Sequence, residues 1–239
     1  MKHRLFWVFN AAILVLPALL GGCGGGGSGS SSSQSPTTTP QPTPIVTVNR
    51  VACVGDSITA GAGVSNPSTQ AYPAVLGRAL GRGYEVRNFG VSGATLLSDR
   101  GAPYRLQGNY TEALRFKPDT LTVALGTNDS RFSFDSATQN QFLRDYKDLI
   151  GAFRAANPQV KVYVCLPVPS YPMIGNMNLT LAGQISPLIR RVARDEGAQI
   201  IDLYTPLSNK PLLFPDGLHP NAAGAAVIAQ EINRALINP

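Results

Sequence analysis

This chain carries, at separate positions, a serine, a histidine and an aspartate that could together form an activated serine nucleophile. Of its two histidines, His3 lies in an N-terminal segment interpreted below as an export signal, which leaves His219 as the candidate imidazole. Asp216 precedes His219 by three residues, and a GDSIT segment at 55–59 contains Ser57. A hydrolase that activates serine needs one imidazole to move the proton and one carboxylate to orient and charge-balance that imidazole. We therefore predict that Ser57, His219 and Asp216 act together.

Apolar strand-like runs alternate with helical patterns from about residue 45 onward. Strands are predicted at Ile45–Val54, Tyr84–Phe89, Thr120–Leu125, Lys161–Leu166 and Gln199–Leu203. Helices are predicted at Tyr72–Leu80, Thr111–Phe116, Ser136–Ala156, Leu179–Glu196 and Ala222–Ile237. This alternation predicts an α/β fold, a three-layer α/β/α sandwich around a mostly parallel five-stranded sheet. In the helix over 136–156, apolar residues recur at helical spacing and are expected to be core: Phe142, Tyr146, Leu149, Ile150 and Phe153.

Polar turns flanked by glycine follow three of the predicted strands. The residues at 55–57 follow the first strand, those at 88–93 follow the second, and GTND at 126–129 follows the third. Ligands of open parallel sheets bind beyond the carboxyl ends of the strands, so we expect these turns to share one rim. The loop with Asp216 and His219 precedes the last predicted helix and can reach the same rim.

The N-terminus has the pattern of an exported, lipid-anchored protein. Lys2 and Arg4 precede an apolar run over 5–20, which is shorter than the roughly 20 apolar residues of a membrane span. The run ends in LGGC at 20–23, which resembles the bacterial lipobox. We predict a signal peptide over 1–22 and lipid attachment at Cys23; a plain signal peptide with a chance cysteine is the alternative. Because Gly24 is not the aspartate associated with inner-membrane retention, the expected location in a two-membraned cell is the outer membrane.

Composition predicts a tether after Cys23. Residues 24 to about 43 are all Gly, Ser, Thr, Pro and Gln, and such a segment cannot bury enough apolar surface to offset the entropic cost of ordering. We therefore place the lipidated cysteine and tether at 23–44 and the catalytic domain at 45–239. The formal net charge of +6 falls by two to +4 without Lys2 and Arg4. This modest excess, without a cluster of basic residues, argues against a nucleic-acid partner.

Cys53 and Cys165 lie inside predicted strands. An extracytoplasmic compartment permits disulfides, but the expected sheet places another strand between them, beyond the roughly 7 Å Cα separation that a bridge allows. We predict two buried free thiols that pack as small apolar groups. Neither lies in an exposed turn, which argues against a catalytic cysteine.

Four segments taken together resemble the blocks of the SGNH hydrolases, also called GDSL-type esterases. They are GDSIT at 55–59, NFGVSGAT at 88–95, GTND at 126–129 and DGLHP at 216–220. Each is weak alone, whereas the ordered set is specific, and the resemblance covers about residues 48–237. The one departure is Ile58, where leucine gives the family its name, and this apolar exchange leaves the chemistry intact. No serine lies in the Gly-x-Ser-x-Gly motif of α/β-hydrolases.

The resemblance implies an SGNH, flavodoxin-like fold and a serine-esterase mechanism. Ser57 would be the nucleophile, His219 the general base and Asp216 the orienting acid. The developing oxyanion would be met by the N–H of Ser57, the N–H of Gly93 and the side-chain amide of Asn128.

Two further aspartates lie next to the predicted catalytic residues. Asp56 and Asp129 are expected to accept backbone hydrogen bonds that fix their turns, rather than to serve as the triad acid. No metal and no other cofactor is expected, because one histidine among scattered carboxylates offers no set of nitrogen and sulfur ligands.

The loops at 96–109 and 167–178 are expected to shape the substrate pocket. The residues singled out in these loops are Arg100, Tyr104, Arg105, Tyr171 and Met173. The polar and aromatic groups of the two loops suit a sugar better than a fatty chain, since neither loop has a long apolar stretch. The segments at 86–93 and 166–169 resemble GDSL enzymes that are grouped with carbohydrate acetylesterases. The leading hypothesis is therefore deacetylation of a glycan outside the cytoplasm.

Several alternatives stay open from the sequence. A lysophospholipase or thioesterase could use the same residues, and acyl transfer onto a sugar would need a pocket that excludes water. A catalytically idle carbohydrate-binding lipoprotein is disfavoured, because a binding module has no need of the full catalytic set. The sequence predicts no oligomeric state.

Overall fold

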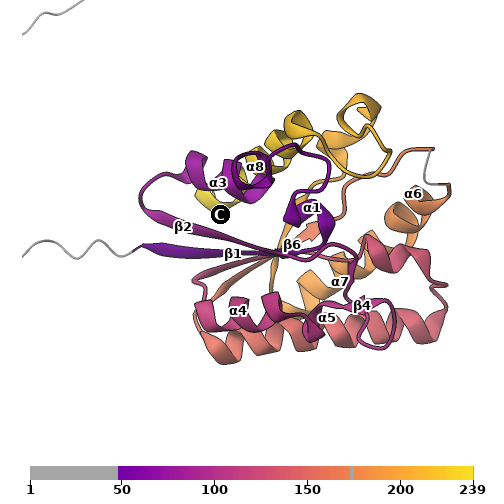
Figure 1. Ribbon diagram of the computed structural model, residues 1–239. Coiled ribbons are helices and arrows are strands. Elements are labelled where there is room, and N and C mark those ends of the chain that lie inside the picture. The colour runs from indigo at the N-terminus through magenta and orange to yellow at the C-terminus, as the bar shows by residue number, and fades with distance from the viewer. Residues whose placement is uncertain (1–47, 173–174, 239) are drawn as a thin grey trace, which may run out of the picture. The chain divides into compact units, whose positions relative to one another are not determined.

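The structure, a computed structural model, describes residues 48–172 and 175–238 (Figure 1). Its main sheet has the strand order β2-β1-β5-β6-β7, and every neighbouring pair is parallel. This confirms the predicted parallel five-stranded sheet. The strands are β1 (Asn49–Gly55), β2 (Tyr84–Gly90), β5 (Thr120–Ala124), β6 (Lys161–Leu166) and β7 (Gln199–Asp202).

The central strands are apolar on both faces because the protein buries both faces. In β1, Val51 and Cys53 belong to one core cluster, whereas Ala52 and Val54 belong to the other. Alternate residues of a strand point to opposite sides of the sheet. A strand that is covered on both sides therefore has a continuous apolar sequence, as parallel strands commonly do.

Two helical layers enclose the sheet, as Figure 1 shows. On one face lie α3 (Tyr72–Leu80) and α8 (Ala222–Ile237); on the other lie α4 (Gly108–Phe116), α5 (Ser136–Ala156) and α7 (Ser186–Glu196). The fold is therefore the predicted three-layer sandwich. The core predicted on α5 is also confirmed, since all five residues are fully buried: Phe142, Tyr146, Leu149, Ile150 and Phe153.

The helix predicted over 179–196 is confirmed, since every residue of that range is helical, but it is not a uniform α-helix. The structure has α6 (Met177–Thr180), then a π-helical turn (Leu181–Ile185), and then α7. Pro187 lies in the first turn of α7 and has no N–H with which to continue an α-helical ladder. In the turn before it, the N–H of Ser186 donates to the carbonyl of Leu181, which is the wider spacing of a π-helix.

The sequence pattern does not predict several short elements. They are α2 (Pro67–Gln70), the two-stranded sheet of β3 (Ala94–Thr95) and β4 (Ala102–Pro103), and the 3₁₀ turns Tyr104–Leu106, Asn128–Arg131, Thr205–Leu207 and Pro211–Leu213. Each is too short to show a hydrophobic period, which is the signal used to predict strands and helices.

The two cysteines of the described residues are free and buried. Cys53 lies on β1 and Cys165 on β6, with β5 between them, as the sequence predicts. Burial raises the pKa of the Cys53 thiol to about 12 and also raises the pKa of Cys165. Since the thiolate is the nucleophilic form of cysteine, neither thiol is suited to catalysis.

The predicted signal peptide (1–22), the lipid-attachment residue Cys23 and the tether (23–44) lie outside the described residues. Within residues 48–172 and 175–238, no helix is both long enough and apolar enough to cross a membrane.

Candidate active site

Ser57 lies at an abrupt transition from strand to helix. Strand β1 ends at Gly55, and Ser57 is the first residue of α1 (Ser57–Ala60). Between them, the side chain of Asp56 caps the helix by accepting a hydrogen bond from the N–H of Ile58 at 3.0 Å. The serine is thus held by the sheet on one side and by a capped helical turn on the other.

Ser57, His219 and Asp216 form a continuous chain of contacts. Ser57 Oγ lies 2.9 Å from His219 Nε2, and His219 Nδ1 lies 2.6 Å from Asp216 Oδ2. The other carboxylate oxygen, Asp216 Oδ1, accepts the N–H of Leu218 at 2.9 Å and the N–H of His219 at 2.7 Å. The structure therefore brings together all three residues that the sequence predicts for a triad.

Asp216 is ionised at neutral pH, and its side chain is more exposed than the imidazole of His219. The exposed fractions of the two side chains are 55% for Asp216 and 23% for His219. Partial burial alone would raise the pKa of Asp216, but hydrogen bonds from the N–H and ring of His219 and from the N–H of Leu218 outweigh it and lower the pKa to about 2. An ionised Asp216 can orient the imidazole and stabilise its charged form at neutral pH.

Hydrogen bonds join the three strand-end loops. The N–H of Val91 donates to the carbonyl of Gly55 at 3.0 Å, which ties the loop after β2 to the nucleophile turn. Asn128 Nδ2 donates to the carbonyl of Ala94 at 3.0 Å, which ties the loop after β5 to the loop after β2. Gly93 lies between these bonded positions with φ +79°, a conformation that favours glycine. Two predicted oxyanion donors, Gly93 and Asn128, are therefore on loops bonded to the nucleophile turn.

Two buried aspartates adjoin the predicted catalytic residues. Asp56 is 1% exposed and Asp129 is 0% exposed. Burial raises the pKa of each carboxyl to about 6, and hydrogen bonds from backbone N–H groups offset this only in part. Asp129 accepts the N–H of Leu96 at 3.0 Å and of Leu97 at 2.8 Å, so it fixes the neighbouring loop. Asp56 Oδ2 has no hydrogen-bond partner among the described residues. Both aspartates accept backbone hydrogen bonds, as the sequence predicts.

Gly63 is a site residue that the sequence pattern does not reveal. Its backbone has φ +92°, and a Cβ added there would lie 2.6 Å from the carbonyl oxygen of Pro220 and 2.9 Å from His219 Cβ. The loop after α1 thus lies directly against the histidine loop. No local signal marks this contact, because the two loops meet only through the fold.

The loop at 96–109 contributes less to a substrate pocket than expected. Tyr104 is fully buried, and its hydroxyl donates to a backbone carbonyl of β2 at 2.8 Å, so the prediction that it lines a pocket is wrong. Arg100 and Arg105 form ion pairs with Asp99 and Asp148 respectively. These residues hold the loop in place instead of presenting free groups to a ligand.

The loop at 167–178 contacts the histidine loop. The N–H of Tyr171 donates to the carbonyl of Gly217 at 2.8 Å, and Gly217 lies between Asp216 and His219. The ring of Tyr171 also packs against Phe214, with 5.2 Å between ring centroids. Met173, the other residue predicted to shape a pocket here, lies outside the described residues.

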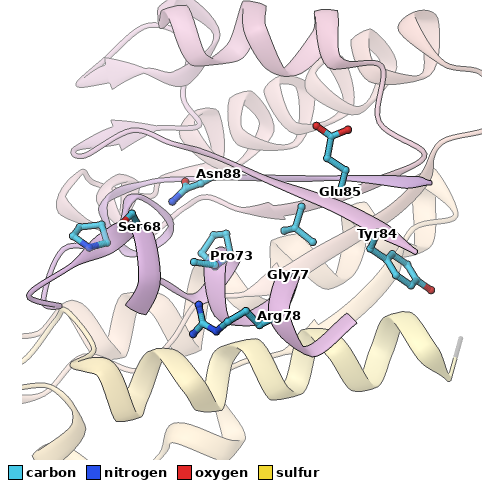
Figure 2. A pocket seen from close by; sticks show the side chains of 10 residues that line it. Ser68, Pro73, Gly77, Arg78, Tyr84, Glu85 and Asn88 are labelled. Carbon is cyan, nitrogen blue, oxygen red and sulfur yellow. The ribbon is translucent and has the colours of Figure 1, made fainter. Parts of the chain in front are cut away.

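A large open groove lies away from the triad. It has a volume of about 670 Å³ and is bounded by α2, α3 and the edge strand β2. Figure 2 shows Pro73 and Arg78 on the α3 side, while Glu85 points away from α3. Neither Ser57 nor His219 lines this groove, so its size does not identify the reaction site.

The arrangement supplies a nucleophile, a base and an orienting acid, which are the elements of acyl transfer. In the part of the chain that the structure describes, no group of three or more His, Cys, Asp and Glu side chains is placed to hold a metal ion.

Residues 53–227 match the GDSL-like Lipase/Acylhydrolase family. The chain belongs to this family. Its domain is accordingly a GDSL-type carboxylic ester hydrolase domain, and the match includes the segments that carry Ser57, Gly93, Asn128, Asp216 and His219.

Individual relatives of this GDSL-type domain include carbohydrate esterases. An acetylxylan esterase of Xylanibacter ruminicola is 36% identical over 209 residues, which are 78% of this chain and 43% of the relative. The chain spans less than half the length of the curated relatives that it matches.

Solved structures show the same fold. Est24, a carbohydrate acetylesterase from Sinorhizobium meliloti, is 22% identical with a TM-score of 0.63, over 79% of this chain and 98% of that one. A lipase/acylhydrolase from Enterococcus faecalis is 22% identical with a TM-score of 0.64, over 79% and 95% of the two chains.

The close approach of Gly63 to the histidine loop predicts a loss of activity on Gly63→Ala. The new methyl group would displace His219 from Ser57, and a misplacement of about 1 Å can cost on the order of 100-fold in rate. We expect kcat for an aryl acetate to fall about 10- to 100-fold. The matched control is Gly81→Ala: Gly81 also has a positive φ, +75°, but a Cβ there meets nothing within 4 Å. Equal kcat losses in the two variants would mean that backbone strain, not the contact, is responsible.

Burial of the Asp56 charge predicts a pH-dependent stability. Because the pKa is about 6 in the folded protein and near 3.8 otherwise, the folded state takes up the proton first as pH falls. Stability should therefore rise as pH falls from 8 to 4.5. Asp56→Asn keeps the acceptor for Ile58 and removes this contribution, so wild type should gain about 2 kcal/mol of unfolding free energy relative to the variant over that range.

Urea denaturation at the two pH values measures this difference. The control is Asp135→Asn at the cap of α5, where a hydrogen bond from the N–H of Thr138 lowers the pKa of the exposed Asp135 carboxyl. That lowered pKa contributes stability that is lost only as pH falls below the ordinary range. The difference in unfolding free energy between wild type and Asp135→Asn should therefore be the same at pH 8 and pH 4.5, and an Asp56→Asn profile parallel to wild type would contradict the explanation.

Proposed function

We propose that this protein is a serine esterase that hydrolyses carboxylic esters through an acyl-enzyme, and that its substrates are O-acetyl groups on a carbohydrate outside the cytoplasm. The observation that carries the proposal is the contact chain from Ser57 Oγ to His219 Nε2 and from His219 Nδ1 to Asp216 Oδ2. This geometry is that of a nucleophile with its general base and orienting acid.

The first step is attack by Ser57 on the ester carbonyl. His219 Nε2 takes the hydroxyl proton across the 2.9 Å contact, and the new C–O bond forms as the carbonyl oxygen gains negative charge. Asp216, ionised because its pKa is about 2, stabilises the imidazolium that results. The same imidazolium then gives its proton to the departing alcohol oxygen.

The oxyanion is stabilised by hydrogen-bond donors on three loops that are bonded to one another. The donors are the N–H of Ser57, the N–H of Gly93 and the side-chain amide of Asn128. Asn128 is 4% exposed, so its amide is shielded from most water. Such a donor typically contributes about 3–4 kcal/mol of transition-state stabilisation. Water then attacks the acyl-enzyme with His219 again as base, which releases the acid and restores Ser57.

The carbohydrate substrate is supported by relatives and by the loops near the triad. The 36%-identical relative is an acetylxylan esterase, and a solved structure with the same fold is a carbohydrate acetylesterase. Tyr171, whose N–H donates to the histidine loop, has a half-buried aromatic ring with a polar hydroxyl, a side chain of the kind that suits contact with a sugar.

A chain-length series tests the proposal. Purified full-length protein is assayed with aryl acetate, butyrate and octanoate, and acetate release is measured from acetylated xylan and other acetylated glycans. We expect acetate to be the best acyl group and at least one glycan to release acetate. Ser57→Ala should lower every rate by at least about 1,000-fold.

Each outcome of the series has a definite meaning. A preference for octanoate together with no acetate from any glycan would overturn the carbohydrate proposal and favour the lysophospholipase alternative. Hydrolysis by Ser57→Ala at the wild-type rate would instead overturn the serine mechanism, whatever the substrate.

We further propose that the protein is exported and anchored to the cell envelope by lipid on Cys23. The LGGC segment after the apolar run supports this proposal. In the producing bacterium, the protein should enter the detergent phase on Triton X-114 partitioning, and Cys23→Ser should move it to the aqueous phase. Ser57→Ala is the control and should partition as wild type does; detergent partitioning by Cys23→Ser would contradict the anchor.

A further inference from the structure

We propose that strand β2 is a dimer interface, at which β2 of a second copy of this chain pairs antiparallel about a twofold axis at Val86. Among the strands that the structure describes, β2 pairs only with β1 and forms one edge of the main sheet. An edge strand presents backbone N–H and C=O groups that another strand can bind. The proposed dimer does not depend on which ester the protein cleaves.

The outer edge of β2 is identified by its bonds to β1. The N–H of Asn49 donates to the carbonyl of Gly83 at 2.9 Å, and the N–H of Val91 donates to the carbonyl of Gly55 at 3.0 Å. The register between the two strands is continuous, and in a parallel pair every second residue of a strand bonds to the same neighbour. The odd-numbered residues of β2 therefore bond to β1, and the backbone groups of its even-numbered residues, Val86 among them, face outward.

The carboxyl end of this outer edge is closed by local bonds, whereas its middle is open. The N–H of Gly90 donates to Asn88 Oδ1 at 2.9 Å, and the carbonyl of Gly90 accepts Asn109 Nδ2 at 3.0 Å. Val86, in contrast, borders the open groove of about 670 Å³ beside α2 and α3 (Figure 2). A second strand therefore has room to approach the middle of β2.

A twofold axis at Val86 uses these outward groups. Residues that face each other in an antiparallel pair alternate between hydrogen-bonded and non-bonded pairs. With the axis at Val86, its N–H and C=O bond to the same groups of the partner's Val86, and Tyr84 faces the partner's Asn88. Glu85 then faces the partner's Arg87 in a non-bonded pair, in which side chains approach most closely.

The charges on β2 make this register self-complementary. Glu85 and Arg87 lie on the same face of the strand, since their carboxylate and guanidinium are 2.6 Å apart within one chain, and their side chains are 42% and 55% exposed. In the dimer, each Glu85 lies between its own Arg87 and the partner's Arg87. Opposite charges that face each other across two strands stabilise the pair.

The same two charges disfavour the adjacent registers. An axis at residue 85 would place Glu85 opposite the partner's Glu85, and an axis at residue 87 would place Arg87 opposite the partner's Arg87. Like charges directly opposite each other are destabilising. Charges on an edge strand commonly prevent pairing, but on β2 they leave one register in which every facing pair of charges is attractive.

The dimer leaves both triads open. The two β2 strands run in opposite directions, so the carboxyl ends of the two sheets, where Ser57 and His219 lie, point to opposite ends of the dimer. Neither of these residues lines the groove beside β2. Each copy should therefore hydrolyse an aryl acetate with the same kcat/KM whether it is paired or not.

Reversing one charge on β2 tests the interface. Full-length protein is studied by sedimentation equilibrium in a density-matched non-ionic detergent, over a dilution series that gives the dimer Kd. We expect wild type to dimerise. Arg87→Glu turns two attractive pairs into repulsive ones, so its Kd should rise at least about tenfold, and Glu85→Arg should have the same effect with the opposite sign of charge.

Mixing the two variants separates the interface from any loss of stability. In a mixed dimer, Glu85→Arg supplies two positive charges and Arg87→Glu supplies two negative charges, so both facing pairs are attractive again. With one variant carrying a donor dye and the other an acceptor dye, energy transfer should show the mixture associating at least about tenfold more tightly than either variant alone. Association through any other segment would not respond to these charges.

The matched control is Arg191→Glu. Arg191 is also an exposed arginine paired with a neighbouring carboxylate, that of Asp195 at 3.4 Å, but it lies on α7, which packs on β6 and β7 at the other side of the sheet. This variant should dimerise with the wild-type Kd.

Three results would overturn the proposed dimer. The first is wild-type protein that stays monomeric at every concentration. The second is a wild-type dimer whose Kd changes in neither Arg87→Glu nor Glu85→Arg, which would place the interface elsewhere. The third is a dimer that both variants weaken and their mixture does not restore, because the antiparallel register at Val86 requires that rescue.

Discussion

The contact between Ser57 and His219 is the interaction on which the rest of the site depends. The two residues come from opposite ends of the domain, so their 2.9 Å approach requires the turn after β1 and the loop before α8 to hold position together. The Asp56 cap holds the serine side, and the N–H groups that bind Asp216 hold the histidine side. Gly63 leaves the space in which the two loops meet. The scaffold therefore sets the geometry on which any rate depends.

Three carboxylates near the site occupy two opposite environments. Asp216 is partly exposed and surrounded by hydrogen-bond donors, which lower its pKa to about 2, whereas burial raises the pKa of Asp56 and Asp129 to about 6. Only Asp216 needs its charge for the proposed mechanism. The two buried aspartates instead hold the loops that carry Ser57 and the oxyanion donors. Their cost in stability is offset by the order that they impose on those loops.

The catalytic residues and the loops that surround them are held by the same parallel sheet. The contact chain of serine, histidine and aspartate could cleave many esters, since function on a common fold is decided by its site rather than by its architecture. Selectivity must come from the loops around it, which a scaffold of this kind can vary freely. One of these loops contacts the histidine loop directly, because the N–H of Tyr171 donates to the carbonyl of Gly217.

The sequence by itself determined whatever depends on short-range pattern. The strand and helix alternation, the apolar face of α5 and the pairing of Asp216 with His219 all follow from residue spacing within one segment. The tertiary structure decided what depends on distant neighbours: the burial of Tyr104 and the contact of Gly63 with the histidine loop. A hydrophobic period shows which face of an element is apolar, but not what covers it. Packing between segments far apart in the chain settles that, and it is packing that turned a set of matching residues into a site.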